Sequence, residues 1–160
     1  MAKTEIRLAR PEDLPAIEAI FRSYEPAHDW ELARGYYEEL FRAPERRPDD
    51  TVFLGVSEGR VVGVVGLVLD RLEAADIFWI GWFYVHKDER GGRHGKRLLT
   101  RAIDEARRRG GRKVYVDTST YRFYAGARRL YDELGFKVEA RLKDYYEKGE
   151  HQIIYGLRLK

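Results

Sequence analysis

Residues 76 to 99 read DIFWIGWFYVHKDERGGRHGKRLL, and three different signals follow one another along this stretch. The first ten residues are apolar on both faces, which predicts a buried central strand. Three glycines and five basic side chains, counting His94, then crowd the residues from 90 to 97. An apolar stripe with helical spacing begins at about Gly95. The segment therefore predicts a central strand, a permissive basic loop and an amphipathic helix.

The loop has the composition of a phosphate-binding turn. The first N–H groups of a helix have no partner within the helix and carry the positive end of its dipole. Glycine lets the backbone turn tightly and lets a ligand approach without meeting a Cβ. A phosphate or diphosphate cradle is one interpretation, and a plain connection with solvated arginines is the other. The residues concerned are Arg90, Gly91, Gly92, Arg93, His94, Gly95 and Lys96.

The rest of the chain alternates between strand and helix patterns. The predicted strands cover residues 4–9, 51–57, 60–70, 76–85, 113–119, 137–146 and 151–159. Helices are predicted from Pro11 to about residue 24, over 30–42, over 95–109 and around 127–134. In the second helix, the predicted buried side comprises Leu32, Ala33, Tyr36, Tyr37, Leu40 and Phe41. The order β-α-α-β-β-β-α-β-α-β-β predicts one α+β domain over residues 1–160, a three-layer structure with a mixed, mostly antiparallel sheet of about seven strands flanked by helices.

Composition and charge limit the function classes. The 160 residues are 44% hydrophobic and 36% charged, which is typical of a globular protein with a well-solvated surface. The chain has no cysteine, and its four histidines show no metal-ligand spacing. A polar start and the lack of long apolar runs predict a cytoplasmic protein with no membrane segment. Ten basic residues fall between positions 90 and 113, which favours an anionic partner, either a nucleic acid or a small phosphorylated ligand.

The stretch VHKDERGGRHGKRLL is similar to the acetyl-CoA loop of the GNAT acetyltransferase superfamily. The residues that match the pattern of this loop are Val85, Arg90, Gly91, Gly95, Leu98 and Leu99. Downstream, ARRLYDELGFK (127–137) resembles a second element of that family, and IRLARPEDLPAI resembles its first strand and helix. The resemblance covers essentially the whole chain and implies an N-acetyltransferase with acetyl-CoA as cosubstrate and no metal. The chain departs from the pattern at Arg93, where the family has a glycine, and at His94, an isoleucine-like position.

The resemblance also implies how the donor is bound. Backbone amides from Arg90 to Lys96 would hold the diphosphate of CoA, and a basic residue beyond the loop would meet its 3′-phosphate. Backbone N–H groups of Phe83 and Val85 would face pantetheine and the thioester, beside a bulge in the fourth strand. Gly81 is consistent with that bulge, or it only makes room for a tryptophan. Tyr124 stands where the family has an asparagine that contacts pantetheine.

Two catalytic roles follow from the resemblance. Tyr131 matches the tyrosine that acts as general acid toward the CoA sulfur. The row of apolar residues that contains it would also fit an ordinary core-facing side of a helix. The glutamate used as base by one branch is replaced here by Trp79. Asp117, at the end of a buried strand, is our predicted base, because we expect partial burial to outweigh nearby arginines and raise its pKa. Its alternatives are a turn cap, Asp76, His86 or water alone.

The acceptor pocket is predicted between two aromatic groups. Tyr24, His28 and Trp30 would line one side, and Tyr145 and Tyr146 the other, unless these rings belong to the core or to hairpin pairs. We expect the primary amine of a small molecule as acceptor, with a protein N-terminus or lysine as alternatives. A CoA-binding or nucleic-acid-binding module without catalysis is the alternative of another class. Nucleic acid is disfavoured because no helix-turn-helix, zinc-finger or RNP pattern is present, and a homodimer is left open.

Overall fold

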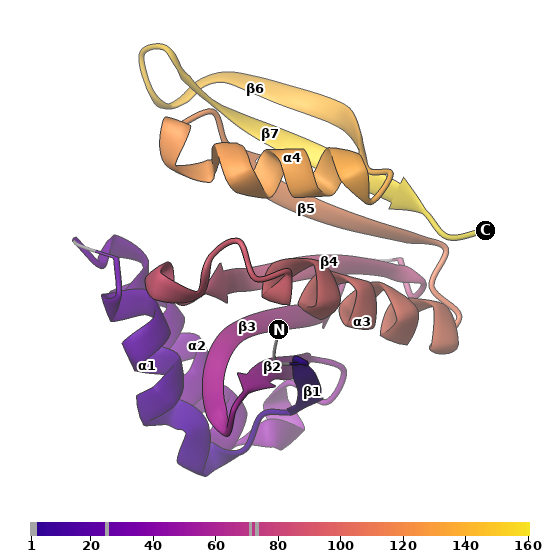
Figure 1. Cartoon of the computed structure of the whole chain (residues 1–160). Coiled ribbons are helices and arrows are strands. Elements are labelled where there is room, and N and C mark those ends of the chain that lie inside the picture. Colours follow the sequence, from indigo (N-terminus) through magenta and orange to yellow (C-terminus); the bar gives the residue numbers. More distant parts are fainter. Residues whose placement is uncertain (1–2, 25, 71, 73) are drawn as a thin grey trace. The chain divides into compact units, whose positions relative to one another are not determined.

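The computed structural model describes residues 3–24, 26–70, 72 and 74–160, and the predicted element order is confirmed in it (Figure 1). The described strands are β1 (Glu5–Leu8), β2 (Thr51–Ser57), β3 (Arg60–Leu69), β4 (Ile77–Val85), β5 (Lys113–Ser119), β6 (Lys137–Glu147) and β7 (Glu150–Arg158). The α-helices are α1 (Leu14–Arg22), α2 (His28–Arg42), α3 (His94–Arg108) and α4 (Ala125–Glu133). Short 3₁₀ turns are η1 (Pro11–Asp13), η2 (Pro44–Arg46), η3 (Lys87–Glu89) and η4 (Arg122–Tyr124).

The strands form a seven-stranded mixed sheet, as predicted. They are hydrogen-bonded in the order β1-β2-β3-β4-β5-β7-β6, so β4 is the fourth of the seven. The pairs β1–β2, β2–β3, β5–β7 and β6–β7 are antiparallel, whereas β4 and β5 are parallel. The register of β4 with β5 covers Ile77–Trp79 against Lys113–Tyr115, and both strands continue beyond it.

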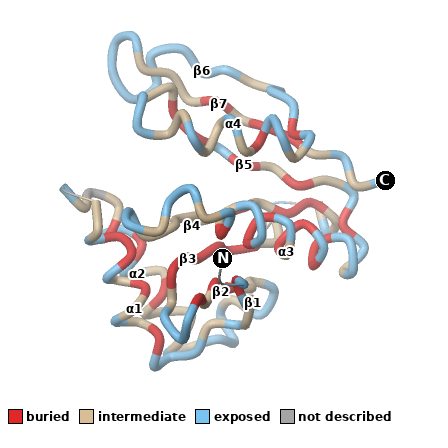
Figure 2. Tube along the Cα trace, in the orientation of Figure 1, coloured by how far each residue is buried: buried red, intermediate tan, exposed pale blue. Residues whose placement is uncertain are grey.

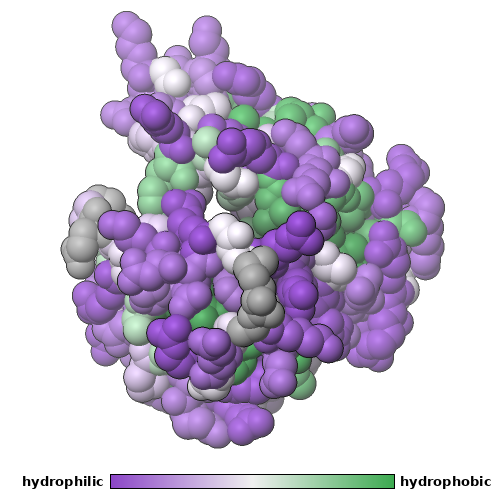
Figure 3. All heavy atoms as spheres, viewed as in Figure 1, coloured by the Kyte–Doolittle hydropathy of each residue, from purple (hydrophilic) through white to green (hydrophobic). Residues whose placement is uncertain are grey.

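The chain divides into two compact units. The N-terminal unit comprises the residues up to Val68 together with Gly81–Ala102, and the C-terminal unit comprises Leu69–Ile80 and Ile103–Lys160. Hydrophilic side chains cover most of the face drawn in Figure 3, as expected from the charged fraction of the sequence. In Figure 2, β3 is largely buried, whereas β6 is exposed along nearly all of its length.

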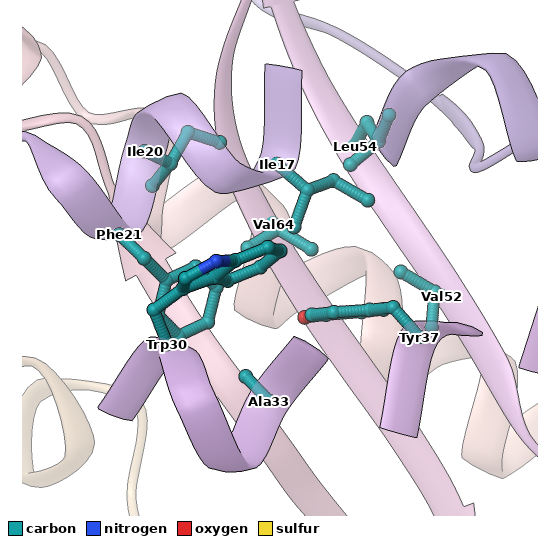
Figure 4. Close-up of a cluster of buried hydrophobic side chains, with 9 residues drawn as sticks. All are labelled: Ile17, Ile20, Phe21, Trp30, Ala33, Tyr37, Val52, Leu54 and Val64. Carbon is teal, nitrogen blue, oxygen red and sulfur yellow. The ribbon is translucent and has the colours of Figure 1, made fainter. Parts of the chain in front are cut away.

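The core of the N-terminal unit lies between α1, α2 and one face of its strands. Its buried side chains point toward one another in Figure 4: Ile17, Ile20, Phe21, Trp30, Ala33, Tyr37, Val52, Leu54 and Val64. Trp30 is 2% exposed, and its ring centroid lies 5.4 Å from that of Phe21. Each large side chain buried in this way contributes about 1.5–3 kcal/mol to folding.

The predicted buried side of α2 was wrong at one position. Leu32 is 71% exposed, while Trp30, Ala33 and Tyr37 face the core. These three are spaced i, i+3 and i+7, which is the spacing of one helix face. Leu32 lies two residues, or about 200°, around the helix from Trp30, which places it outside that face.

The opposite face of the N-terminal unit's strands receives α3. Gly55 of β2 and Gly63 of β3 are cross-strand partners, and the side chain of Leu98 lies over both. A Cβ at Gly63 would lie only 2.6 Å from Leu98 Cδ1, and one at Gly55 would lie 3.4 Å from it. The glycine pair therefore forms a recess that fixes the first turns of α3 against the strands.

The start of the chain is held by a partly buried ion pair. Arg7 donates to both carboxylate oxygens of Asp13 at 2.7 and 2.8 Å, and the Arg10 N–H donates to the same carboxylate at 2.7 Å. The bond from Arg7 is the largest cause that lowers the pKa of Asp13 below its ordinary value of 3.8. A carboxylate with a lowered pKa stabilises the fold above its unfolded pKa, and this contribution disappears as the pH falls through the folded one.

We predict that Asp13→Asn lowers the free energy of unfolding by about 1–2 kcal/mol at neutral pH. The loss relative to the native protein should shrink as the pH drops below 3.8, because Asp13 then becomes protonated. Urea unfolding at neutral pH and near pH ~3 measures both differences. Glu18→Gln is the matched control, since the Glu18–Arg22 pair is exposed and its loss should cost under about 0.5 kcal/mol. A pH-independent loss in Asp13→Asn would contradict the assignment.

Candidate active site

The extended conformation of β4 is interrupted at Trp82. Its φ is 47°, in the left-handed region that a bulky residue rarely adopts. The interruption falls beside Gly81, where the sequence predicted a bulge. The glycine that the packing requires is Gly66 of β3, since a Cβ there would lie 2.8 Å from the Gly81 carbonyl oxygen. A Cβ at Gly81 itself would make only an ordinary contact with Val68.

The end of β4 is anchored to the end of α1. The hydroxyl of Tyr24 donates a hydrogen bond to the backbone carbonyl of Val85, and Ser23 Oγ accepts one from the Lys87 N–H at 3.0 Å. Burial raises the pKa of Tyr24, against a smaller lowering by Arg90, so its hydroxyl stays protonated and can donate. The guanidinium carbon of Arg90 lies 5.5 Å from the centre of the Tyr24 ring. Tyr24, predicted as part of an acceptor pocket, thus holds the strand end that leads into the glycine-arginine loop.

The loop itself contains two left-handed residues. Gly91 has a φ of 83° and Arg93 a φ of 65°. Arg93 replaces the glycine expected from the family pattern, and it keeps the glycine-like conformation. Helix α3 begins directly afterwards at His94 and is 15 residues long. The backbone amides of the loop therefore lie next to the helix N-terminus, which carries the positive end of the helix dipole.

Gly92 has almost no room for a side chain, whereas Gly91 has open space around it. A Cβ there would lie 2.7 Å from Nε2 and 3.0 Å from Cδ2 of His94. The backbone of the loop therefore rests directly on the imidazole ring. In the sequence, His94 counts among the basic residues of the loop and stands at an isoleucine-like position of the family pattern, but neither observation predicts this contact.

Tyr131 lies in the core of the C-terminal unit. It is 4% exposed, and its ring lies 5.7 Å from Phe136 and 5.5 Å from Tyr155. Burial raises its pKa well above its ordinary value, and the charge of Asp117 adds to this rise. Tyr124, another predicted donor-site residue, ends η4 just before α4.

Asp117 is exposed, which contradicts the burial that the sequence analysis expected for it. Its Oδ2 accepts a hydrogen bond of 3.1 Å from the Gln152 side-chain amide. Strand alternation explains the exposure, since Val116 and Thr118 on the opposite face are buried. The expected burial is therefore wrong, and any role of Asp117 as a base rests on its position instead.

The alternative bases have local partners. Asp76 forms an ion pair with Arg112 at 3.1 Å, and this bond is the main cause that lowers the pKa of Asp76. His86 Nδ1 accepts a hydrogen bond from the Asp88 N–H at 3.2 Å, which caps η3. Trp79, which replaces the glutamate of one family branch, donates its indole N–H to Asp70 at 3.3 Å.

The predicted acceptor residues fall in both units. Trp30 is a core residue, so its assignment to a pocket was wrong, and the side chain of His28 lies outside the described residues. Tyr145 is 56% exposed on β6 beside Tyr146, and their ring centroids are 4.9 Å apart. Tyr24 belongs to the N-terminal unit and these two tyrosines belong to the C-terminal one, so a shared pocket stays a prediction.

Two further properties concern the described part of the chain as a whole. No group of three or more His, Cys, Asp or Glu side chains that could hold a metal ion is found among the described residues. Within the same residues, no helix is both long and apolar enough to cross a membrane.

Comparison with known proteins gives a consistent family. The Acetyltransferase (GNAT) family matches residues 16–136. A protein from Desulfovibrio desulfuricans described as of the GNAT family is 23% identical, with a TM-score of 0.88, covering 99% of this chain and all of its own. The Salmonella typhimurium protein yncA, solved with its cofactor acetyl-CoA, is 23% identical, with a TM-score of 0.77 and coverages of 98% and 94%.

A third solved structure is that of the ribosomal-protein-alanine N-acetyltransferase from Brucella melitensis. It is 25% identical, with a TM-score of 0.77, and the match covers 97% of this chain and 99% of that one. Comparison with curated protein sequences gives no match. The chain belongs to the GNAT family and is an acetyl-CoA-dependent N-acetyltransferase.

We predict that Gly92→Ala weakens CoA binding about tenfold, because the new Cβ must displace either His94 or the loop. Isothermal titration with CoA measures the change. Gly35→Ala in α2 is the matched control, since a Cβ there meets nothing within 4 Å, and the variant should bind CoA like the native protein. CoA affinity that is unchanged in Gly92→Ala would show that the loop conformation does not matter for binding.

Proposed function

We propose that the protein transfers the acetyl group of acetyl-CoA to the primary amine of a small molecule by direct attack on the thioester. A nitrogen–carbon bond forms and the carbon–sulfur bond breaks. The amine gives up one proton and the departing thiolate receives one. The observation that carries the proposal is the loop before α3, where Gly91 and Arg93 adopt left-handed conformations at a helix N-terminus.

The donor is held chiefly by backbone groups in this proposal. Amides of residues 90–96 bind the diphosphate, and Arg93 and Lys96 add positive charge. The N–H groups of Phe83 and Val85 bind pantetheine, and the interruption at Trp82 supports this because it changes the direction of the strand just before them. Tyr124 takes the place of the pantetheine-binding asparagine, and a basic residue of α3 meets the 3′-phosphate.

Tyr131 stabilises the leaving group, which is the thiolate of CoA. Its raised pKa keeps the hydroxyl protonated at neutral pH, so it can donate a hydrogen bond to the sulfur. A thiol has a pKa of about 8.5, well below that of this tyrosine. Complete proton transfer from Tyr131 is therefore uphill, and the hydroxyl acts mainly by stabilising the thiolate.

Asp117 receives the proton of the amine, directly or through a water. An alkyl amine has a pKa of about 10.4 and is mostly protonated at neutral pH, so an acceptor for its proton is needed. The carboxylate is exposed and is oriented by Gln152. Its negative charge reaches Tyr131, which supports a common site for the two groups.

The two roles are tested together with Tyr131→Phe and Asp117→Asn. We predict that Tyr131→Phe lowers kcat about 10- to 100-fold with an unchanged melting temperature, because only the hydroxyl is lost. Asp117→Asn should lose the acidic limb of the pH–rate profile at saturating acetyl-CoA. If kcat of Tyr131→Phe equals that of the native protein while chemistry is rate-limiting, Tyr131 has only a packing role. An unchanged profile in the second would leave water or another group as the base.

The acceptor class rests on exposed aromatic side chains of the C-terminal unit. The ring of Tyr121 lies 5.9 Å from that of Tyr146, which contacts Tyr145. The Tyr121 hydroxyl donates to Glu147 at 2.8 Å, and this bond is the main cause that raises the pKa of Tyr121 to about 12. Aromatic faces with a carboxylate attract alkylammonium groups, and a set of four side chains suits a small molecule.

A protein N-terminus is the second candidate acceptor. The Brucella enzyme, a ribosomal-protein-alanine acetyltransferase, is 25% identical over nearly the whole chain. The position of Asp117 at the end of β5 also supports this candidate, because the branch that acetylates ribosomal-protein N-termini has a glutamate at the corresponding strand end.

Release of CoA thiol from acetyl-CoA separates these functions. The assay compares small mono- and diamines with a peptide that begins with alanine, and mass spectrometry identifies the acetylated nitrogen. We predict turnover with small primary amines that is at least about tenfold faster than with the peptide. Turnover with the peptide alone would replace the small-molecule proposal by an N-terminal acetyltransferase. Tight CoA binding without turnover on any amine would favour a binding protein.

A further inference from the structure

His94 is a buried histidine at the edge of the donor loop. It is the first residue of α3 and is 6% exposed. Its Nδ1 lies 2.7 Å from the hydroxyl of Thr4, a residue 90 positions earlier in the chain. Thr4 is buried as well, just before β1, and its carbonyl accepts a hydrogen bond of 3.4 Å from Arg97.

The other ring nitrogen faces the segment that precedes the loop. Nε2 of His94 lies 3.7 Å from a carboxylate oxygen of Glu89, whose other oxygen accepts a hydrogen bond of 2.9 Å from Arg60. With the proton on Nε2, Nδ1 accepts the Thr4 hydroxyl proton and the Nε2–H points toward Glu89. The imidazole therefore connects β1 with η3 across the base of the loop.

The middle of the loop lies against this ring. A Cβ at Gly92 would come within 2.7 Å of Nε2, so the glycine backbone is in direct contact with the imidazole. The next residue, Arg93, has a φ of 65°, a left-handed conformation that is unfavourable for a residue with a side chain. Such a conformation persists only where the surroundings determine it, and a buried ring that is hydrogen-bonded at Nδ1 and packed against Gly92 supplies that support.

We infer that His94 is a positioning residue that holds residues 90–93 in the conformation that binds the diphosphate of acetyl-CoA. The inference rests on the proposed use of this loop for the donor. It assigns to the side chain of His94 a role that the family pattern, with an isoleucine-like residue here, does not contain. A histidine that merely filled the core would affect the stability of the protein but not its affinity for CoA.

The first test replaces the ring by an apolar side chain. In His94→Leu we expect the dissociation constant for CoA, measured by isothermal titration, to rise about tenfold. The melting temperature without ligand is recorded beside it, and the stabilisation by CoA should shrink even where the ligand-free value is unchanged. Affinity equal to that of the native protein would overturn the inference.

The second test changes the partner and leaves His94 in place. Thr4→Val removes the hydroxyl with little change in volume and should weaken CoA binding several-fold. Thr4→Ser keeps the hydroxyl and should restore native affinity. The double variant with His94→Leu should bind no more weakly than His94→Leu alone, because both changes break the same contact. Equal affinities for Thr4→Val and Thr4→Ser, or additive losses in the double variant, would contradict the role.

The outcomes also separate this inference from the proposed function. If the native protein does not bind CoA, the donor assignment itself fails. If the native protein binds CoA and the variants bind equally well, only the role of His94 fails. Should His94→Leu not fold, the Thr4→Val and Thr4→Ser pair decides the question, since each retains the imidazole.

Discussion

The contact of Leu98 with the glycine pair of β2 and β3 places the donor loop. Without a Cβ at Gly55 and Gly63, the first turns of α3 come close to the strands, and Leu98 fills the recess. The N-terminus of the helix is thereby fixed relative to the strands of its own unit. A larger residue at Gly63 would push α3 outward, and the amides that bind phosphate would move with it. In the proposed donor site, CoA binding thus depends on two glycines that do not belong to the glycine-rich loop.

Three further attachments hold the loop once α3 is in place. Ser23 and Tyr24 hold the backbone on the side of β4, and Thr4 holds His94 on the side of α3. Glu89 lies between them, bonded to Arg60 and facing the imidazole. Because the ends are fixed, the left-handed conformation of Arg93 can persist without a ligand. Binding of an anion then costs little free energy for ordering the loop.

The order of elements was readable from the sequence because it depends on local patterns. Strand β5 was predicted with its observed bounds, and α3 begins one residue from its predicted start. Contacts between distant segments were not readable: nothing in the pattern pairs Thr4 with His94 or places Gly66 against Gly81. Trp30 was misassigned because α2 is apolar around much of its surface, and only packing against Phe21 selects the buried face. Asp117 was misjudged because a buried strand exposes alternate residues where one face is uncovered.

The two compact units divide the chemistry between them. The N-terminal unit holds the loop and helix start that we propose to bind the diphosphate. The C-terminal unit holds Tyr131 and Asp117, the proposed leaving-group and base residues. The proposed acceptor residues lie on β6, which is exposed along nearly all of its length, and on the turn that precedes η4. Side chains there can change with little effect on a packed core, because few of them are buried. If the proposed donor and acceptor sites are right, the acceptor side chains can vary without disturbing the packing that holds the donor loop.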